Sequence, residues 1–296
     1  MEKIKKLLSE KIKDIEKIKE ILSEKNRVYI ICLAVFCISG GILLHKYISE
    51  KDAQDKFESL AVVSTEETTE IQEEEETVFT YLGVENPGKV IDWEALWEEN
   101  EDIYAWIYIP NTNIDYPILQ HPTDDMYYLE HNLDGSSGLP GCIYTEKINE
   151  KNFTDHNTLI YGHNMRNGTM FKDVHKFAES DFFEENRYVF IYTPEELLIY
   201  DIYAAYRFTD AHILYSYDCV TEDGFSSYLE MVQENYGASG NFRDVEVTGE
   251  DHVITLSTCV SGQDDKRQLL QAVLVEYNET QADDGASMDE ATETEE

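Results

Sequence analysis

The feature that most constrains this chain is an uncharged, apolar run close to its N-terminus. The segment VYIICLAVFCISGGILL covers residues 28–44, and Tyr47 and Ile48 can extend it. Its 17 residues reach the lower end of the length that a membrane-spanning helix needs. A lysine-rich segment precedes the run and an acidic segment follows it, which predicts a cytoplasmic N-terminus. We therefore expect a single transmembrane anchor over residues 28–48.

A cleaved signal peptide is the competing interpretation of the same run. The basic region before it is unusually long, and no small-x-small cleavage site follows it. Cys37 would fit an acylated lipoprotein cysteine, but the bulky Phe36 precedes it where a small residue is expected. The flanking residues therefore favour an anchor that is retained.

The segments around the anchor differ in charge and periodicity. Residues 1–27 place Ile and Leu at spacings of three and four, which predicts a cytoplasmic amphipathic helix whose role is left open between stalk, self-association and lipid contact. Residues 49–79 contain EEEE and read as an extended, acidic, extracellular linker. Residues 279–296 read as an acidic, disordered tail. The folded domain is expected over residues 80–278.

The charge of the chain excludes one class of partner. The formal net charge is -38, and residues 28–296 carry 14 basic against 55 acidic side chains. Such a body repels phosphate backbones, so we expect no nucleic-acid partner. The charge instead suits solubility outside a cell.

Short β-type runs dominate residues 80–278 and predict a mainly β fold. Tyr, Val and Ile recur in them with period-two alternation, and no sustained strand-then-helix order appears. A closed, mostly antiparallel barrel with peripheral helices fits best. The expected helices are a tryptophan-bearing one near residue 93, one at 170–178 and one at about 225–236. The expected strands include 103–109, 115–120, 141–146, 157–163, 188–193, 197–208, 244–247, 252–259 and 267–277.

The cysteine count leaves an unpaired thiol outside the membrane. Of five cysteines, Cys32 and Cys37 fall in the apolar run, which leaves Cys142, Cys219 and Cys259. An odd number in an exported domain points to a reactive thiol. Cys142 has the sequence context of a small buried residue and Cys219 that of an incidental loop thiol, but the count alone does not choose among the three.

Three strand ends carry groups that could act together. The run HVITLSTC ends at Cys259, NTLIYGH ends at His163, and RQLLQAVLVEY begins at Arg267. A thiolate is the nucleophilic form of cysteine, and an imidazole can take its proton and later protonate a leaving amine. An arginine fork can hold a carbonyl and stabilise an oxyanion. This chemistry requires no metal and no cofactor.

Several motifs together resemble the sortases, and their class B branch in particular. They are TLSTC at 255–259 with Arg267 eight residues on, YGHNM at 161–165, WIYIPNTNIDYPILQ at 106–120, DDMYYLEH at 124–131 and GTMFKDV at 168–174. The helix near 225–236 is similar to the extra helix of that branch. The resemblance covers about residues 88–278 and implies the eight-stranded sortase β-barrel.

The resemblance also implies roles for individual residues. It implies Cys259 as nucleophile, His163 as general acid or base, and Arg267 as the clamp for substrate and oxyanion. Ser257 matches a position that binds the sorting peptide, and Leu129 and Tyr215 are further substrate-binding positions. The family often has Asn where this chain has Asp125, which bears on substrate preference.

The implied reaction is that of a cysteine transpeptidase, a thiol protease-like acyltransferase of Gram-positive bacteria. It would cleave a C-terminal sorting signal of secreted proteins after Thr, form a thioester, and transfer the acyl group to a peptidoglycan-precursor amine. The chain would be a single-pass membrane protein with its catalytic domain outside. A pilin-polymerising enzyme with a lysine acceptor is the alternative within the family.

Three interpretations outside the family are weaker: two other cysteine enzymes and a non-catalytic receptor. A wall L,D-transpeptidase would carry a Ser-x-Gly-Cys-x-Arg pattern, whereas here Thr258 precedes Cys259 and the arginine is eight residues away. A papain-like peptidase would place its cysteine near the start of the mature domain. A non-catalytic surface receptor with the same barrel would show no reactive thiol at Cys259, and a barrel alone does not establish activity.

Overall fold

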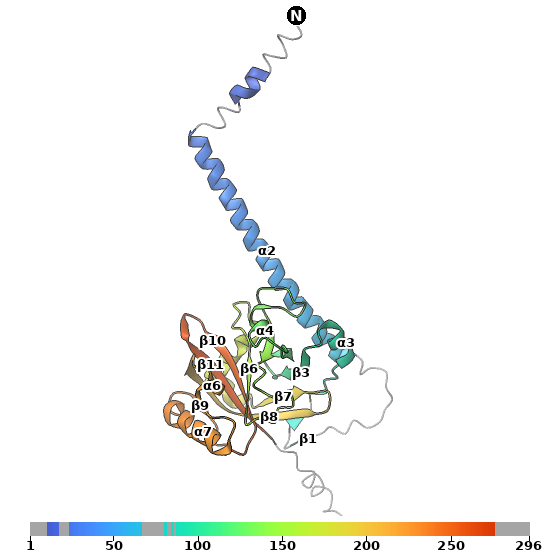
Figure 1. The fold of residues 1–296 in the computed structure, drawn as a ribbon, viewed down its shortest axis with the longest axis vertical. Coiled ribbons are helices and arrows are strands. Elements are labelled where there is room, and N and C mark those ends of the chain that lie inside the picture. Colours follow the sequence, from blue (N-terminus) through green and yellow to red (C-terminus); the bar gives the residue numbers. More distant parts are fainter. Residues whose placement is uncertain (1–10, 18–23, 67–79, 82–83, 86, 276–296) are drawn as a thin grey trace, which may run out of the picture. The chain divides into compact units, whose positions relative to one another are not determined.

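The computed structural model describes residues 11–17, 24–66, 80–81, 84–85 and 87–275 (Figure 1). The chain divides into two units, Met1–Asp52 and Ala53–Glu296. Within the predicted N-terminal helix, residues 11–17 are helical, and the rest of that prediction up to residue 23 lies outside the described residues. Residues 67–79 of the predicted linker and the predicted tail at 279–296 also lie outside them.

Helix α2 (Glu24–Glu66) contains the predicted anchor and continues beyond it. Its stretch Asn26–Phe57, 32 residues long, contains an apolar window with a mean hydropathy of 2.3 and is long and apolar enough to cross a membrane, a test that a signal sequence also passes. The sequence predicted an extended linker from residue 49, whereas the chain stays helical to Glu66. Residues 50–60 consist largely of Glu, Lys, Ala, Gln and Leu, which are good helix formers. Phe57 and Leu60 are also buried in the second unit, so packing as well as propensity supports the helix there.

The second unit is a closed barrel of eight strands, as the sequence predicted. In sheet order, β11, β10, β6, β5, β4, β3, β7 and β8 are neighbours, and β8 pairs back onto β11. Two of the eight pairings, β10–β6 and β4–β5, are parallel and the others are antiparallel. Closure removes the exposed edges that an open sheet would present. The strands are β3 (Ile103–Tyr108), β4 (Asp115–Leu119), β5 (Ile143–Thr145), β6 (Asn157–Tyr161), β7 (Tyr188–Tyr192), β8 (Leu197–Thr209), β10 (Val253–Val260) and β11 (Gln263–Leu274).

Short helices surround the barrel, and two begin at side-chain caps. The Asp92 carboxylate accepts a hydrogen bond from the Ala95 amide (3.0 Å) at the start of α3, and the Thr221 hydroxyl accepts one from Gly224 (3.1 Å) at the start of α7. These are the predicted tryptophan-bearing helix and the predicted helix near 225–236. The elements are α3 (Trp93–Glu99), α4 (Tyr127–Glu130), the 3₁₀ helix η2 (Phe171–Ala178), α5 (Ser180–Glu185), α6 (Ile213–Ser216) and α7 (Glu222–Tyr236). Two small pieces complete the described sheet structure: the hairpin β1 (Thr80–Tyr81) with β2 (Val84–Glu85), and β9 (Asn241–Phe242) beside β8.

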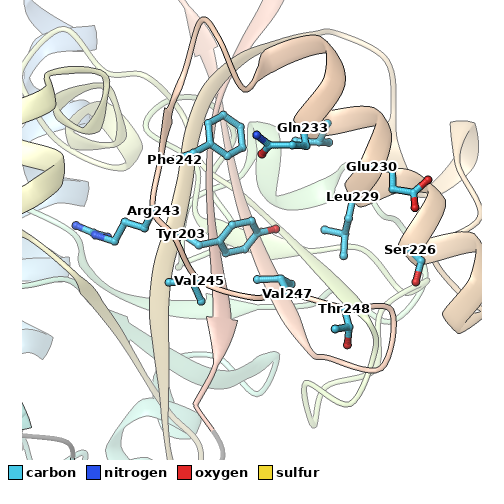
Figure 2. A pocket seen from close by; sticks show the side chains of 11 residues that line it. Tyr203, Ser226, Leu229, Glu230, Gln233, Phe242, Arg243, Val245, Val247 and Thr248 are labelled. Carbon is cyan, nitrogen blue, oxygen red and sulfur yellow. The ribbon is translucent and has the colours of Figure 1, made fainter.

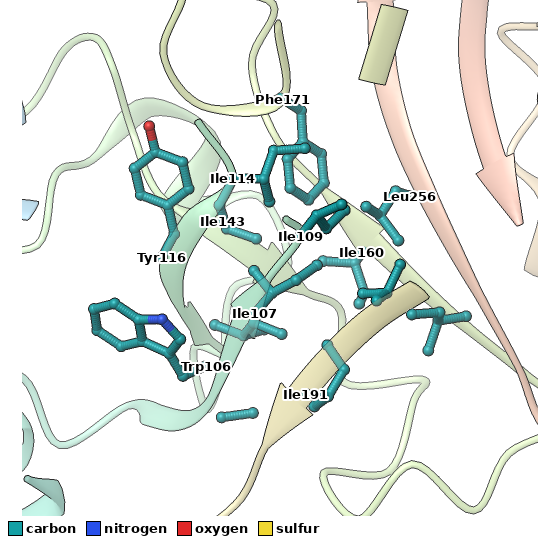
Figure 3. Close-up of a cluster of buried hydrophobic side chains, with 14 of the residues drawn as sticks. Trp106, Ile107, Ile109, Ile114, Tyr116, Ile143, Ile160, Phe171, Ile191 and Leu256 are labelled. Carbon is teal, nitrogen blue, oxygen red and sulfur yellow. The ribbon is translucent and has the colours of Figure 1, made fainter. Parts of the chain in front are cut away.

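Side chains that alternate between the two faces of the strands form two apolar cores. The larger core gathers residues from all eight barrel strands, including Ile107, Ile160 and Leu256, and it fills the barrel (Figure 3). Because successive side chains of a strand point to opposite faces, the neighbours of these residues point outward. The outward residues Leu159, Val253 and Leu269 join a second core with Phe225 and Tyr228 of α7. Strands β6, β10, β11 and β8 are therefore covered on both faces.

One predicted strand is absent. Residues 244–247 (DVEV) alternate like a strand but form no ladder, and the short strand there is β9, a few residues earlier. Val245 and Val247 instead pack onto the second core, next to α7. Their period-two spacing thus reflects one apolar side facing a helix rather than a sheet pairing.

The burial of Phe57 predicts that the C-terminal part of α2 stabilises the barrel. Its side chain is 2% exposed and meets Tyr116 edge-on, with ring centroids 5.6 Å apart. We expect Phe57→Ala to lower the free energy of unfolding by about 3–5 kcal/mol, since it removes a buried aromatic ring. Urea unfolding of the full chain in detergent measures this, with Phe57→Leu as the milder control. Equal stability of the three proteins would contradict the packing.

Candidate functional site

Strand β10 holds Cys259 near its end, between two neighbours of fixed register. On one side β11 runs antiparallel, and Cys259 pairs directly with Arg267. On the other side β6 runs parallel, and its last residue, Tyr161, pairs with Ser257. The β10–β11 register shifts immediately after Cys259, which marks an irregularity at the strand end. The Cys259 side chain is exposed there.

The residues that the sequence nominated share one face of the sheet. Cys259 lies two residues from Ser257 and opposite Arg267, so the three side chains point to the same outer side. A cavity of about 230 Å³ opens on this side, and it brings Cys259, His163 and Arg267 together. Its apolar wall comes from Met126, Leu129, Leu159, Phe208, Ile213 and Leu269.

His163 follows β6 by two residues and is held by a backbone carbonyl. Its Nε2 lies 2.7 Å from the Leu129 carbonyl oxygen, so this nitrogen carries the hydrogen and donates it. In the neutral ring the other nitrogen, Nδ1, is then the acceptor. The Phe171 amide donates to the His163 carbonyl (3.0 Å), which ties the loop to η2. The ring is thus oriented with Nδ1 available for proton exchange.

Gly141 makes the contact between Leu129 and His163 possible. Its φ is +69°, a conformation that favours glycine. A Cβ on Gly141 would lie 2.8 Å from the Tyr128 carbonyl oxygen, 3.0 Å from that of Leu129 and 3.4 Å from Cδ2 of His163. Only glycine, which has no side chain, allows the Leu129 carbonyl to keep its hydrogen-bonding position next to the imidazole.

Arg267 is anchored on the first residues of its own strand, β11. One guanidinium nitrogen donates to the carbonyls of Asp264 and Lys266, each at 2.9 Å. These partners are backbone oxygens and not carboxylates. They hold the guanidinium beside the cavity.

The three expected substrate-binding residues divide into two that line the cavity and one that does not. Ser257 is buried at 7% exposure, and it lines the cavity with Leu129. Tyr215 is 68% exposed and lies outside the lining. It stacks on His212, which does line the cavity, with ring centroids 4.3 Å apart.

The lining of a second, larger cavity contains neither a cysteine nor a histidine. This cavity measures about 390 Å³ and lies between α7 and the segment 242–248, as Figure 2 shows. Tyr203, Leu229 and Phe242 contribute to its wall. Arg243, at its edge, donates to the carbonyls of Ile202, Phe183 and Asn186 and stacks on the Phe183 ring. These contacts join β9 to the barrel, and the chemistry lies at the other cavity.

The comparisons with known proteins agree with this geometry. The sortase domain model matches residues 107–275. Sortase B of Listeria monocytogenes is 32% identical over 252 residues, which cover 83% of this chain and 94% of that protein. The crystal structure of Clostridium perfringens sortase B superposes with a TM-score of 0.56 at 28% identity, covering 62% of this chain and 99% of that one. A Staphylococcus aureus sortase B–substrate complex gives 0.55 at 26% identity, covering 62% and 85%.

The chain belongs to the sortase family, in its class B branch. Membership makes it a cysteine transpeptidase of cell-wall anchoring. The closed barrel with its peripheral helices matches the sortase B structures.

This sortase also has a polar cluster in the cavity that its sequence did not reveal. His212 Nε2 lies 2.7 Å from the Glu146 carboxylate, and the Tyr161 hydroxyl lies 3.2 Å from the same nitrogen. The Glu146 side chain is 6% exposed, and burial raises the pKa of its carboxyl. The sequence gives no signal for this pair, because 66 residues separate His212 from Glu146 and no motif links the two.

The other two cysteines of the barrel unit differ sharply from Cys259. Cys142 is 1% exposed, as its sequence context predicted, and burial raises the pKa of its thiol. Cys219 is 6% exposed in spite of its polar loop, and burial raises its pKa to about 11. Thiolate is the reactive form, so neither thiol is poised to react at neutral pH.

We expect iodoacetamide at pH 7.5 to alkylate Cys259 well before Cys142 or Cys219 in the full chain in detergent. The raised pKa values keep both buried thiols protonated until the pH approaches their titration range, and burial blocks access to them. Peptide mass mapping over time measures each cysteine separately, including Cys32 and Cys37. Equal labelling of Cys219 and Cys259 in the folded protein would contradict the assignment.

The close contacts of Gly141 predict a selective loss of function. Gly141→Ala should displace the Leu129 carbonyl and tilt His163, lowering turnover by at least about tenfold, with about 1–3 kcal/mol less stability from the strained φ. Gly88→Ala is the matched control, because Gly88 has φ +67° but a Cβ there meets no atom within 4 Å. It should share the strain and keep the turnover. A similar loss of turnover in both variants would attribute the effect to strain alone.

Proposed function

We propose that this sortase cleaves a sorting signal of secreted proteins after a threonine, with Cys259 as nucleophile, and transfers the acyl group to an amine. The observation that carries the proposal is the position of Cys259. It is exposed at a strand end, lies directly opposite Arg267, and shares one cavity with His163. A structural cysteine has no need of these neighbours, because buried thiols pack as small apolar groups.

The first half of the reaction forms a thioester. The Cys259 thiol transfers its proton to Nδ1 of His163, and the sulfur attacks the threonine carbonyl carbon. The carbonyl oxygen becomes an oxyanion, which the Arg267 guanidinium stabilises by charge and hydrogen bonds. The carbon–nitrogen bond then breaks, and the leaving amine takes the proton from His163. Sulfur and acyl carbon remain joined.

The second half regenerates the thiol. An acceptor amine attacks the thioester carbon and gives its proton to His163. The carbon–sulfur bond breaks, and the leaving thiolate is reprotonated by the imidazolium, so that no net proton is consumed. A peptidoglycan-precursor amine is the acceptor we favour, and a pilin lysine would be handled by the same groups.

The shape of the cavity supports a peptide substrate. Its apolar wall suits a proline or an aliphatic side chain, and Ser257, Glu146 and His212 add polar groups. A related structure, that of Staphylococcus aureus sortase B, was solved as a substrate complex. Leu129 would contact the peptide with its side chain while its carbonyl holds His163. Tyr215 would contact it only at the rim, through its stack on His212.

We further propose that α2 anchors the protein in the membrane. The stretch Asn26–Phe57 has the required length and hydropathy, and none of its apolar window is buried. The basic residues before it would hold the N-terminus in the cytoplasm and leave the barrel outside. Sorting signals and wall precursors are both met at that outer face.

Cleavage of quenched fluorescent peptides tests the proposal. The full chain in detergent is incubated with pentapeptides that contain proline and threonine, with and without an amine acceptor. Cys259→Ala should abolish cleavage, and His163→Ala should slow it about 100- to 10,000-fold. Arg267→Lys keeps the charge but loses the fork, and should cost about 100-fold or more in turnover.

Cys37→Ala serves as the matched thiol control, because that cysteine lies in the apolar run of α2. It should leave cleavage unchanged. Mass spectrometry of the products then separates a wall-peptide amine from a pilin-type lysine as acceptor. Absence of cleavage for every peptide, with slow alkylation of Cys259, would favour the non-catalytic receptor instead.

A further inference from the structure

The backbone carbonyl of Cys259 lies where β10 extends past its parallel neighbour. The last ladder contact between the two segments runs from the Gly162 amide to the Ser257 carbonyl (3.2 Å). Carbonyls two residues apart on a strand point to the same side, so the Cys259 carbonyl also points toward the β6 side. The ladder between β10 and β6 ends at the Ser257–Tyr161 pair, so β6 cannot supply a donor there. A carbonyl without a partner at this position would leave the strand end poorly fixed.

Two side chains supply the hydrogen-bond donors that β6 does not provide at this position. Asn164 Nδ2 donates to the Cys259 carbonyl at 2.8 Å, and His175 Nε2 lies 3.0 Å from the same oxygen. A carbonyl oxygen has two lone pairs, so it accepts both bonds. The donors stand 95 and 84 residues from Cys259 in sequence and come from the loop after β6 and from η2. The end of β10, the loop after β6 and η2 are therefore connected through one atom, the carbonyl oxygen of Cys259.

The protonation of His175 suits this contact. Because the partner is a carbonyl oxygen, Nε2 must carry a hydrogen. Burial has the largest effect and lowers the pKa of His175. The hydrogen bond to the Cys259 carbonyl acts in the opposite direction, and the charges of Lys172 and Arg207 lower the pKa further. The ring is therefore neutral at neutral pH, with its single hydrogen on Nε2 and directed at Cys259.

Asn164 extends the contact into the following turn. The same Nδ2 donates to the Ser261 hydroxyl at 3.2 Å. That turn leads directly into β11, whose first residues include Asp264 and Lys266, the residues whose carbonyls hold the Arg267 guanidinium. Asn164 is moreover the residue directly after His163. One side chain thus couples the loop of the imidazole to the turn between the thiol and the guanidinium.

We propose that Asn164 and His175 are positioning residues, a carbonyl clamp that fixes the peptide plane after Cys259 and so aims its thiol into the cavity. The proposal rests on the proposed function, since it assigns the clamp a part in turnover. A planar peptide bond transmits the restraint: fixing the carbonyl fixes the backbone torsion of Cys259, and with it the direction of the Cα–Cβ bond. The register shift that follows Cys259 would otherwise leave this torsion free.

Removing either donor should lower turnover without weakening substrate binding. We expect Asn164→Ala and His175→Phe each to reduce kcat about tenfold, the scale of one lost hydrogen bond, with KM within about twofold. His175→Gln retains an amide donor and should recover most of the loss. Arg166→Lys changes an exposed residue of the same loop and is the control that should behave as wild type.

Hydrogen–deuterium exchange of the full chain in detergent reports on the clamp without any substrate. Peptides covering residues 258–264 should take up deuterium several-fold faster in Asn164→Ala and His175→Phe, but not in His175→Gln or Arg166→Lys. Unchanged uptake in the first two variants, or a kcat within twofold of wild type, would overturn the clamp. If the wild-type protein cleaves no peptide, the proposed function fails, while the exchange rates still decide whether the clamp exists.

Discussion

The register of β10 between β6 and β11 is the constraint on which the site depends. Antiparallel pairing with β11 puts Cys259 directly opposite Arg267, and parallel pairing with β6 brings the chain to His163 two residues after the ladder ends. Strand side chains alternate, so a slip of one residue would turn Cys259 into the barrel and Thr258 out into the cavity. The three groups meet only in the register that the apolar residues of both faces enforce.

Burial on both faces makes that register costly to change. Inside the barrel, Ile254 and Leu256 of β10 pack in the main core. On the outer face, Gln271 stands opposite Thr255 and donates to its hydroxyl (3.0 Å), while its side-chain oxygen accepts from the hydroxyls of Tyr203 (3.2 Å) and Tyr206 (3.1 Å). Gln271 is fully buried, so any slip would leave its amide unsatisfied in an apolar core. This polar network lies beneath α7. It helps to fix the register of β10 and therefore the position of Cys259.

The sequence was sufficient for the barrel, and it also nominated the three residues that now line one cavity, because both predictions start from local signals. Period-two runs mark strands, and Cys259, His163 and Arg267 each stand at the end or start of such a run, where a closed sheet brings them together. The linker after residue 48 was misjudged, because composition does not reveal that Phe57 packs against Tyr116. The pair Glu146–His212 and the donor His175 were missed for a related reason: their partners lie 66 and 84 residues away, and only the folded chain defines those contacts.

Backbone carbonyls, rather than carboxylates, organise the groups around the thiol. Leu129 offers its carbonyl to His163, Asp264 and Lys266 offer theirs to Arg267, and the Cys259 carbonyl is itself the acceptor for Asn164 and His175. A neutral acceptor orients a donor without adding a formal negative charge. In a protein of net charge -38, this keeps the immediate partners of the imidazole and the guanidinium uncharged. The guanidinium can then stabilise an oxyanion, because its partners do not include a neighbouring carboxylate. Glu146, the buried acid of the cavity, has His212 rather than Arg267 as its side-chain partner.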